Sequence, residues 1–148
     1  MSQENVEIVR RAWEMLAKAV RRGDPPGAAF DECVREGIIA SNLDWRAGVR
    51  GGAGAVGIGD FAGRDGFVEF MRRWTEDFDD FAIELEEIID AGNDRVVAIT
   101  RQRGTGKASG ATVHIRTGAI YTLDTHRIVR VELFHQPRDA LEAAGLEK

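Results

Sequence analysis

The chain has 148 residues, 43% of them hydrophobic and 30% charged, with a formal net charge of −5. These values are typical of one globular domain and exclude a disordered or fibrous protein. Because an acidic chain offers no basic surface to a phosphate backbone or an anionic bilayer, we expect neither nucleic acid nor a membrane as partner.

The cysteine and histidine content limits metal and disulfide chemistry. A single cysteine, Cys33, excludes an internal disulfide framework, and three scattered histidines without a second thiol predict no metal site. The N-terminal segment lacks the profile of an export signal, and no apolar run reaches about 18 residues. We therefore expect a cytoplasmic protein without a cofactor.

The first half of the chain is predicted to be helical. Apolar residues recur at steps of three and four over residues 3–22, which places them on one face of a helix. Gly23 ends this helix, and a second is expected over 24–36 because Asp24 can cap it and proline tolerates its first turn. The same helical spacing returns over 64–77.

The second half changes to the period of two that is typical of β-strands. Four long strands are expected, at residues 81–90, 95–103, 111–123 and 127–135. Their short connections allow only antiparallel neighbours. A short extended segment at 38–46 and a final helix between Pro137 and Gly145 complete an α+β fold, with the N-terminal helices on a curved, mainly antiparallel sheet around a pocket.

Alternation along the strands predicts which side chains face the helices. In the last strand this set is Val129, Val131, Leu133 and His135, and in the strand before it Val113, Ile115, Thr117, Ala119, Tyr121 and Leu123. Because an unpaired arginine is costly to bury, Thr100 and Gln102 are expected to point inward, and Val97 and Ile99 outward toward a covered face. The polar residues directed at the pocket are then Thr100, Gln102, Tyr121 and His135.

Three of the candidate residues have alternative interpretations. His135 could move a proton near neutral pH, or it could be bonded to the backbone at a strand end. Trp13 and Trp45 could form flat walls for an apolar ligand, although core packing explains Trp13 equally well. Asp44 could be a catalytic carboxylate, but a solvated strand-end acid is favoured, and His114 and His126 are expected at the surface.

Two glycine-rich motifs are expected to be loops. Residues 52–57 match the dinucleotide fingerprint G-x-G-x-x-G, but no buried strand precedes them and no helix follows. We interpret residues 47–63 as a loop, with the possibility of a lid left open. Residues 104–107 are interpreted as a hairpin loop.

Several segments in order resemble SnoaL-like proteins of the nuclear transport factor 2-like superfamily. The segments are residues 6–13 and 22–24 near the N-terminus, residues 61–66, residues 91–97, and a closing stretch that runs from residues 128–132 to residues 140–145. The resemblance covers nearly the whole chain and implies a single domain, a cone-shaped α+β barrel with a deep pocket, and a homodimer paired through the outer sheet face. The superfamily includes isomerases, epoxide hydrolases, polyketide cyclases and non-catalytic binders, so the fold alone does not assign a function.

The catalytic sets known in this superfamily are not matched. At the positions of the acidic residues of ketosteroid isomerase-like proteins stand Trp45 and Ala119. At the Arg and Asp positions of limonene epoxide hydrolase-like proteins stand Thr100, Gln102 and Leu133.

Two hypotheses remain open. The first is a cyclase, isomerase or hydrolase acting on an apolar carbonyl ligand, in which His135 moves the proton, Tyr121 and Gln102 bond the polarised oxygen, and Thr100 orients the substrate. The second is a homodimer that binds a small ligand without chemistry.

Overall fold

The computed structural model describes residues 2–47, 61–76, 78–134 and 136–146. The helices are α1 (Ser2–Arg22), α2 (Pro26–Arg35), α3 (Gly63–Glu76) and α4 (Pro137–Ala143). The strands are β1 (Ile39–Ala47), β2 (Phe61–Ala62), β3 (Phe78–Gly92), β4 (Arg95–Gly106), β5 (Thr112–Asp124) and β6 (Arg127–Phe134). The predicted α+β class is confirmed, and the predicted helices and strands lie close to their expected positions.

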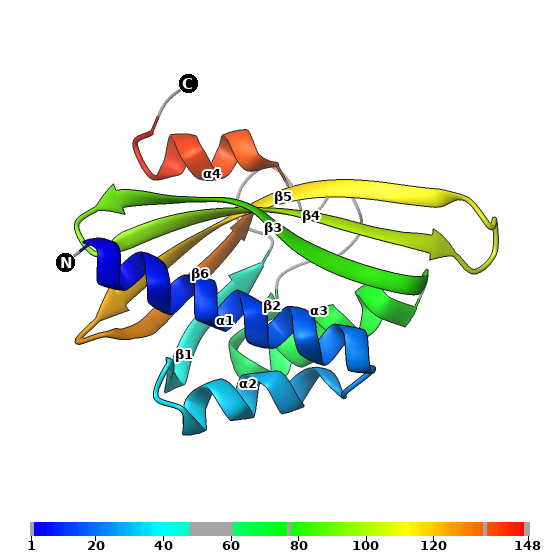
Figure 1. Cartoon of the computed structure of the whole chain (residues 1–148), viewed down its shortest axis with the longest axis horizontal. Helices are drawn as coiled ribbons and strands as arrows, with labels where there is room; N and C mark the ends of the chain where they lie inside the picture. Colours follow the sequence, from blue (N-terminus) through cyan, green and yellow to red (C-terminus); the bar gives the residue numbers. More distant parts are fainter. Residues whose placement is uncertain (1, 48–60, 77, 135, 147–148) are drawn as a thin grey trace.

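The strands form one sheet in the order β2-β1-β6-β5-β4-β3, and α1, α2 and α3 lie on one side of it (Figure 1). The meander from β3 to β6 is antiparallel, as its short turns predict. The parallel pairing of β1 with β6 was not predicted. The strands β2 and β3 are the two ends of this order, so in the described residues the sheet is open rather than closed into a barrel.

The main core lies between the sheet and the first three helices. Val9 on α1 and Val96 and Ala98 on β4 are fully buried there. The alternate residues of β4, Val97 and Ile99, pack in a second cluster on the opposite face. The predicted alternation is therefore confirmed in β4.

The helix α4 covers that second cluster, so helices lie on both faces of the sheet (Figure 1). Gly118 on β5 allows the close approach, because a Cβ there would lie 2.8 Å from the Ala140 Cβ. Phe134, which is 1% exposed, fills the space beneath the helix. Part of the outer face that was expected to need a partner is thus covered by the chain's own C-terminal helix.

A β-bulge breaks the predicted alternation in β6. Leu123 pairs with Ile128 and Thr122 with Arg130, so one extra residue, Val129, stands between the two pairs. As a result Ile128 and Val131 both pack in the main core. The prediction that Val129 continues the inward set is wrong, whereas Val131 and Leu133 do contact the main core.

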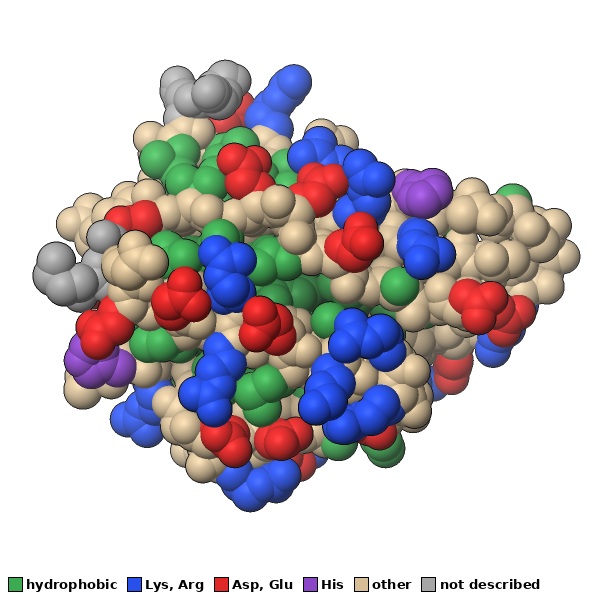
Figure 2. Space-filling view, in the orientation of Figure 1, with side chains coloured by type: hydrophobic (Ala, Val, Ile, Leu, Met, Phe, Trp, Pro, Cys, Tyr) green, Lys and Arg blue, Asp and Glu red, His purple; other side chains and the backbone are tan. Residues whose placement is uncertain are grey.

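The visible surface is charged and of mixed sign. Figure 2 shows Lys and Arg side chains interspersed with Asp and Glu over α1 and the neighbouring surface. None of the helices in the described ranges combines the length and the hydropathy that a membrane span requires.

Candidate functional site

An apolar cavity of about 80 Å³ lies between the helices and the inner face of the sheet. Its walls come from α1, α2, α3, β1, β5 and β6. They are Ala12, Trp13, Leu16, Ala29, Phe30, Cys33, Ile39, Leu43, Trp45, Phe67, Tyr121, Ile128 and Val131. We call this space the inner cavity.

Aromatic rings fix the shape of one wall. Alternation along β1 turns Leu43 and Trp45 inward. The Trp45 ring meets Phe67 edge to face at 5.5 Å between centroids, and Phe70 at the same distance. These are favourable aromatic geometries, so the Trp45 indole is held in place by α3.

The second wall depends on the packing of α2 against α3. Arg64 donates two hydrogen bonds of 2.8 Å to the Asp31 carboxylate, and its guanidinium carbon lies 5.9 Å from the Phe30 ring centroid. Gly27 makes room for this side chain, because a Cβ at that position would lie 2.5 Å from the Arg64 Nη2. The wall residue Phe30 is thereby positioned.

Three side chains of the described inner cavity wall carry a proton that can form a hydrogen bond. They are the indole of Trp13, the hydroxyl of Tyr121 and the thiol of Cys33. The rings of Trp13 and Tyr121 are 6.5 Å apart at 71°. The Trp13 Nε1 is buried and has no hydrogen-bond partner among the described residues. Burial raises the pKa of the Tyr121 hydroxyl well above its usual value and outweighs the opposite effect of the Trp13 side chain, which interacts with that hydroxyl without forming a hydrogen bond of regular geometry. Tyr121 is therefore a neutral donor at pH 7.

Cys33 is also protonated at neutral pH. Burial, helped by the nearby Glu32 carboxylate, raises the pKa of the thiol to about 11. The Cys33 Sγ lies 3.8 Å from the Met15 Sδ. Among the described lining residues, Cys33 and Tyr121 are the ones that can titrate, and neither is a base at pH 7.

We expect native Cys33 to react with iodoacetamide about a hundredfold more slowly at pH 8 than in the unfolded chain, because the thiolate is the nucleophile and its fraction falls tenfold per pKa unit. The rate should rise about tenfold per pH unit until the pH nears 11, whereas the unfolded chain levels off near pH 9. Mass spectrometry of the alkylated protein measures both rates. If the alkylation rates of the native and the unfolded chain levelled off at the same pH, this would contradict the burial of the thiol.

Two other predicted site residues, Thr100 and Gln102, do not line this cavity. Thr100 and Gln102 point inward and are buried, as predicted, but they bond to Thr117. The Thr100 and Thr117 hydroxyl oxygens are 2.9 Å apart, and the Gln102 Nε2 donates to the Thr117 hydroxyl at 3.3 Å. His135 lies outside the described residues, and so does the glycine motif at 52–57.

Asp44 lies at the surface, as the favoured interpretation predicts. Its side chain is 39% exposed and accepts a 2.8 Å hydrogen bond from the Arg46 Nε, which lowers the pKa of the carboxyl. His114 and His126 are exposed too, as expected. The interpretation of residues 104–107 as a hairpin loop is wrong for most of the segment, because Gly104 and Thr105 pair with Val113 and Thr112 at the end of β4 and the turn begins only at Lys107.

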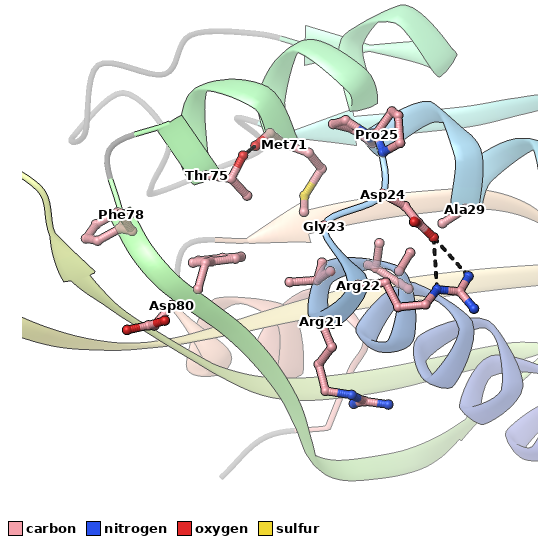
Figure 3. A pocket seen from close by; sticks show the side chains of 15 residues that line it. Arg21, Arg22, Gly23, Asp24, Pro25, Ala29, Met71, Thr75, Phe78 and Asp80 are labelled. Atoms are coloured by element: carbon pink, nitrogen blue, oxygen red, sulfur yellow. Dashed lines mark hydrogen bonds and ion pairs between the residues drawn. The ribbon is translucent and has the colours of Figure 1, made fainter.

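A second, larger cavity of about 620 Å³ opens beside the first (Figure 3). It lies between the α1–α2 turn, the end of α3 and the start of β3, and we call it the outer groove. Gly23, at φ 73°, forms the turn, and the Arg22 guanidinium binds the Asp24 carboxylate beside it. Sequence reasoning missed this groove, although the break at residues 23–26 marks its edge.

Within the described residues, His, Cys, Asp and Glu side chains do not gather in groups of three or more that could hold a metal ion.

Comparison with known proteins agrees with this architecture. Residues 10–131 match the model of the SnoaL-like domain, so the chain belongs to the SnoaL-like family. No curated protein matches.

Solved structures share the fold. One is a nuclear transport factor 2-like protein of unknown function from Burkholderia pseudomallei, with a TM-score of 0.62 and 20% identity over 94% of this chain and 95% of that one. Another is a putative SnoaL-like polyketide cyclase from Jannaschia sp., with a TM-score of 0.62 and 16% identity over 89% and 85%. A third, TerC crystallised with polyporic acid, has a TM-score of 0.62 and 19% identity over 96% and 98%.

Proposed function

We propose that this protein binds a small, largely apolar carbonyl compound in the inner cavity. The observation that carries the proposal is the Trp13 Nε1, a buried donor in the wall of an apolar space that forms no hydrogen bond of regular geometry within the described residues. An unsatisfied buried donor costs about 1–3 kcal/mol, and a ligand oxygen that accepts from it would remove this cost. The crystallisation of TerC with polyporic acid shows that a protein of this fold can be obtained with an organic ligand.

Binding is favoured over chemistry by the protonation states of the wall. A reaction at a carbonyl compound needs a base as well as a donor to the oxygen. Tyr121 and Cys33 keep their protons at pH 7, so they can donate hydrogen bonds but cannot take up a proton as a general base. The described part of the wall therefore suits recognition of a carbonyl oxygen.

Cyclopentanone, a ketone of six heavy atoms, is a suitable probe for so small a cavity. We expect it to raise the unfolding temperature, because a ligand that binds only the folded state stabilises that state. It should also slow the alkylation of Cys33, which shares the same wall. A ketone that raises neither the unfolding temperature nor the protection of Cys33 at 10 mM would overturn the proposal.

A second candidate function is acid–base catalysis on the bound carbonyl compound. It is favoured by the similarity to the putative polyketide cyclase and requires a base, for which His135 is our candidate. Thr100 and Gln102 would then support the substrate only if it extended toward Thr117.

If the second candidate is correct, the protein should exchange the α-protons of cyclopentanone for deuterium faster than buffer does. We expect His135→Ala to reduce this rate to that of buffer while cyclopentanone still binds, and the exposed His126→Ala to leave it unchanged. Proton NMR in deuterated water measures the exchange. Exchange at the buffer rate in the unsubstituted protein rejects this candidate and leaves binding alone.

We also propose a homodimer that uses the outer sheet face beyond α4. This face carries the Glu86 carboxylate, paired with Arg101 at 3.0 Å and Arg116 at 2.9 Å, so the contact would be partly polar. Sedimentation at micromolar concentration tests it, and a monomer alone would reject it.

A further inference from the structure

The inner cavity is small for a complete ligand. Ligand sites in proteins usually measure about 300–1,000 Å³. The inner cavity has about 80 Å³, whereas the outer groove, with about 620 Å³, lies within that range. A ligand anchored at Trp13 must therefore extend beyond the inner cavity unless it is very small.

The two spaces adjoin at two side chains. Leu16 on α1 and Ala29 on α2 line both the inner cavity and the outer groove. Ala29 is only 5% exposed, and its small side chain leaves the Leu16 side chain as the larger part of the partition. A linear chain could pass where these residues meet.

The outer groove is arranged for an amphiphilic chain. Its deeper residues are apolar and buried, namely Ala19, Ala29 and Met71. Its rim carries charged side chains from the α1–α2 turn and from β3, among them Arg21, Arg22 and Asp80 (Figure 3). The groove thus offers apolar surface close to the inner cavity and polar surface toward solvent.

We infer that the ligand is an elongated aliphatic carbonyl compound, with its carbonyl end in the inner cavity and its chain passing Leu16 and Ala29 into the outer groove. This inference rests on the proposed function and names the substrate class of the same site. Leu16 is then the residue that limits ligand length. The far end of the chain lies at the rim, where a polar group would remain in contact with water.

Linear methyl ketones from 2-butanone to 2-nonanone test this inference without any substitution. We expect the affinity to rise about fourfold for each added CH₂ group, because each one leaves water for apolar surface. Isothermal titration or ligand-observed NMR measures the series. An affinity that stops rising at about five carbons, while cyclopentanone still binds, overturns the inference but leaves the proposed function intact. If cyclopentanone does not bind either, both fail.

Leu16→Trp tests the passage itself. The larger side chain should block the chain of 2-nonanone and reduce its affinity about a hundredfold. Because Leu16 also lines the inner cavity, cyclopentanone is measured in the same variant as a reference, and its loss of affinity should be at least tenfold smaller. Lys18→Trp, on the exposed side of the same helix, is the matched control and should bind the whole series normally. If Leu16→Trp does not fold, Ala29→Val narrows the passage from the other side. Normal binding of 2-nonanone by a folded variant overturns the inference.

Discussion

Trp45→Ala is expected to lower the free energy of unfolding by about 3–5 kcal/mol, the usual cost of removing a buried large aromatic side chain. Trp45 is 6% exposed and contacts Phe67 and Phe70, so the variant loses these contacts and leaves a hole. The hole adjoins the inner cavity, because Trp45 is one of its walls. The larger cavity should therefore admit a free indole molecule.

Indole should rescue this variant. At a concentration a hundred times its dissociation constant, a ligand that binds only the folded state adds about 2.7 kcal/mol. Arg46→Ala is the control, since Arg46 is the next residue, is exposed, and forms a surface ion pair with Asp44, which contributes little to stability. Urea denaturation with and without indole gives both values. A loss below 1 kcal/mol, or no effect of indole on Trp45→Ala, would contradict the place of Trp45 in the cavity wall.

Phe134→Ala is expected to have an effect of similar size on the other side of the sheet. The Phe134 side chain is 1% exposed and packs with Ile120 and Ala140, so its removal should cost about 3–5 kcal/mol and loosen α4. The matched control is Val129→Ala, at the half-buried bulge residue of the same strand, which should cost about 1 kcal/mol.

Urea denaturation measures this difference, and limited proteolysis reports whether α4 is released. Equal losses in the two variants would show that α4 does not depend on the side chain beneath it.

The sequence predicts most of the fold because its signals are local. Helical spacing over 3–22 and alternation in β4 depend only on neighbours along the chain, and both agree with the structure. The pairing of β1 with β6 joins residues 86–89 positions apart, from Ile39 with Ile128 to Arg46 with Glu132, and nothing local specifies it. The bulge at Val129 likewise depends on the register with β5, which the sequence does not reveal.

The candidate site was predicted only in part for the same reason. Alternation correctly places Tyr121 inward, and the structure brings it together with Trp13 and Trp45. Alternation also turns Thr100 and Gln102 inward, but it does not indicate which part of the strand faces the inner cavity. These two residues bond to Thr117 instead of lining the inner cavity. Their proposed roles, and that of His135, remain predictions.

The outer groove lies where three elements distant in sequence meet, so no single segment could reveal it. The sequence does show the edge of the groove at the α1–α2 turn, because Gly23 and the prolines that follow it end α1. The position of that turn against Met71 and Phe81 depends on tertiary packing.

The most direct test compares cyclopentanone with methylenecyclopentane, its hydrocarbon counterpart, in the unsubstituted protein and in Trp13→Phe. If the buried indole N–H of Trp13 recognises a carbonyl oxygen, the substitution should weaken ketone binding about tenfold and change hydrocarbon binding less than twofold. Equal changes for both compounds, or no binding of the ketone to the unsubstituted protein, would contradict the account.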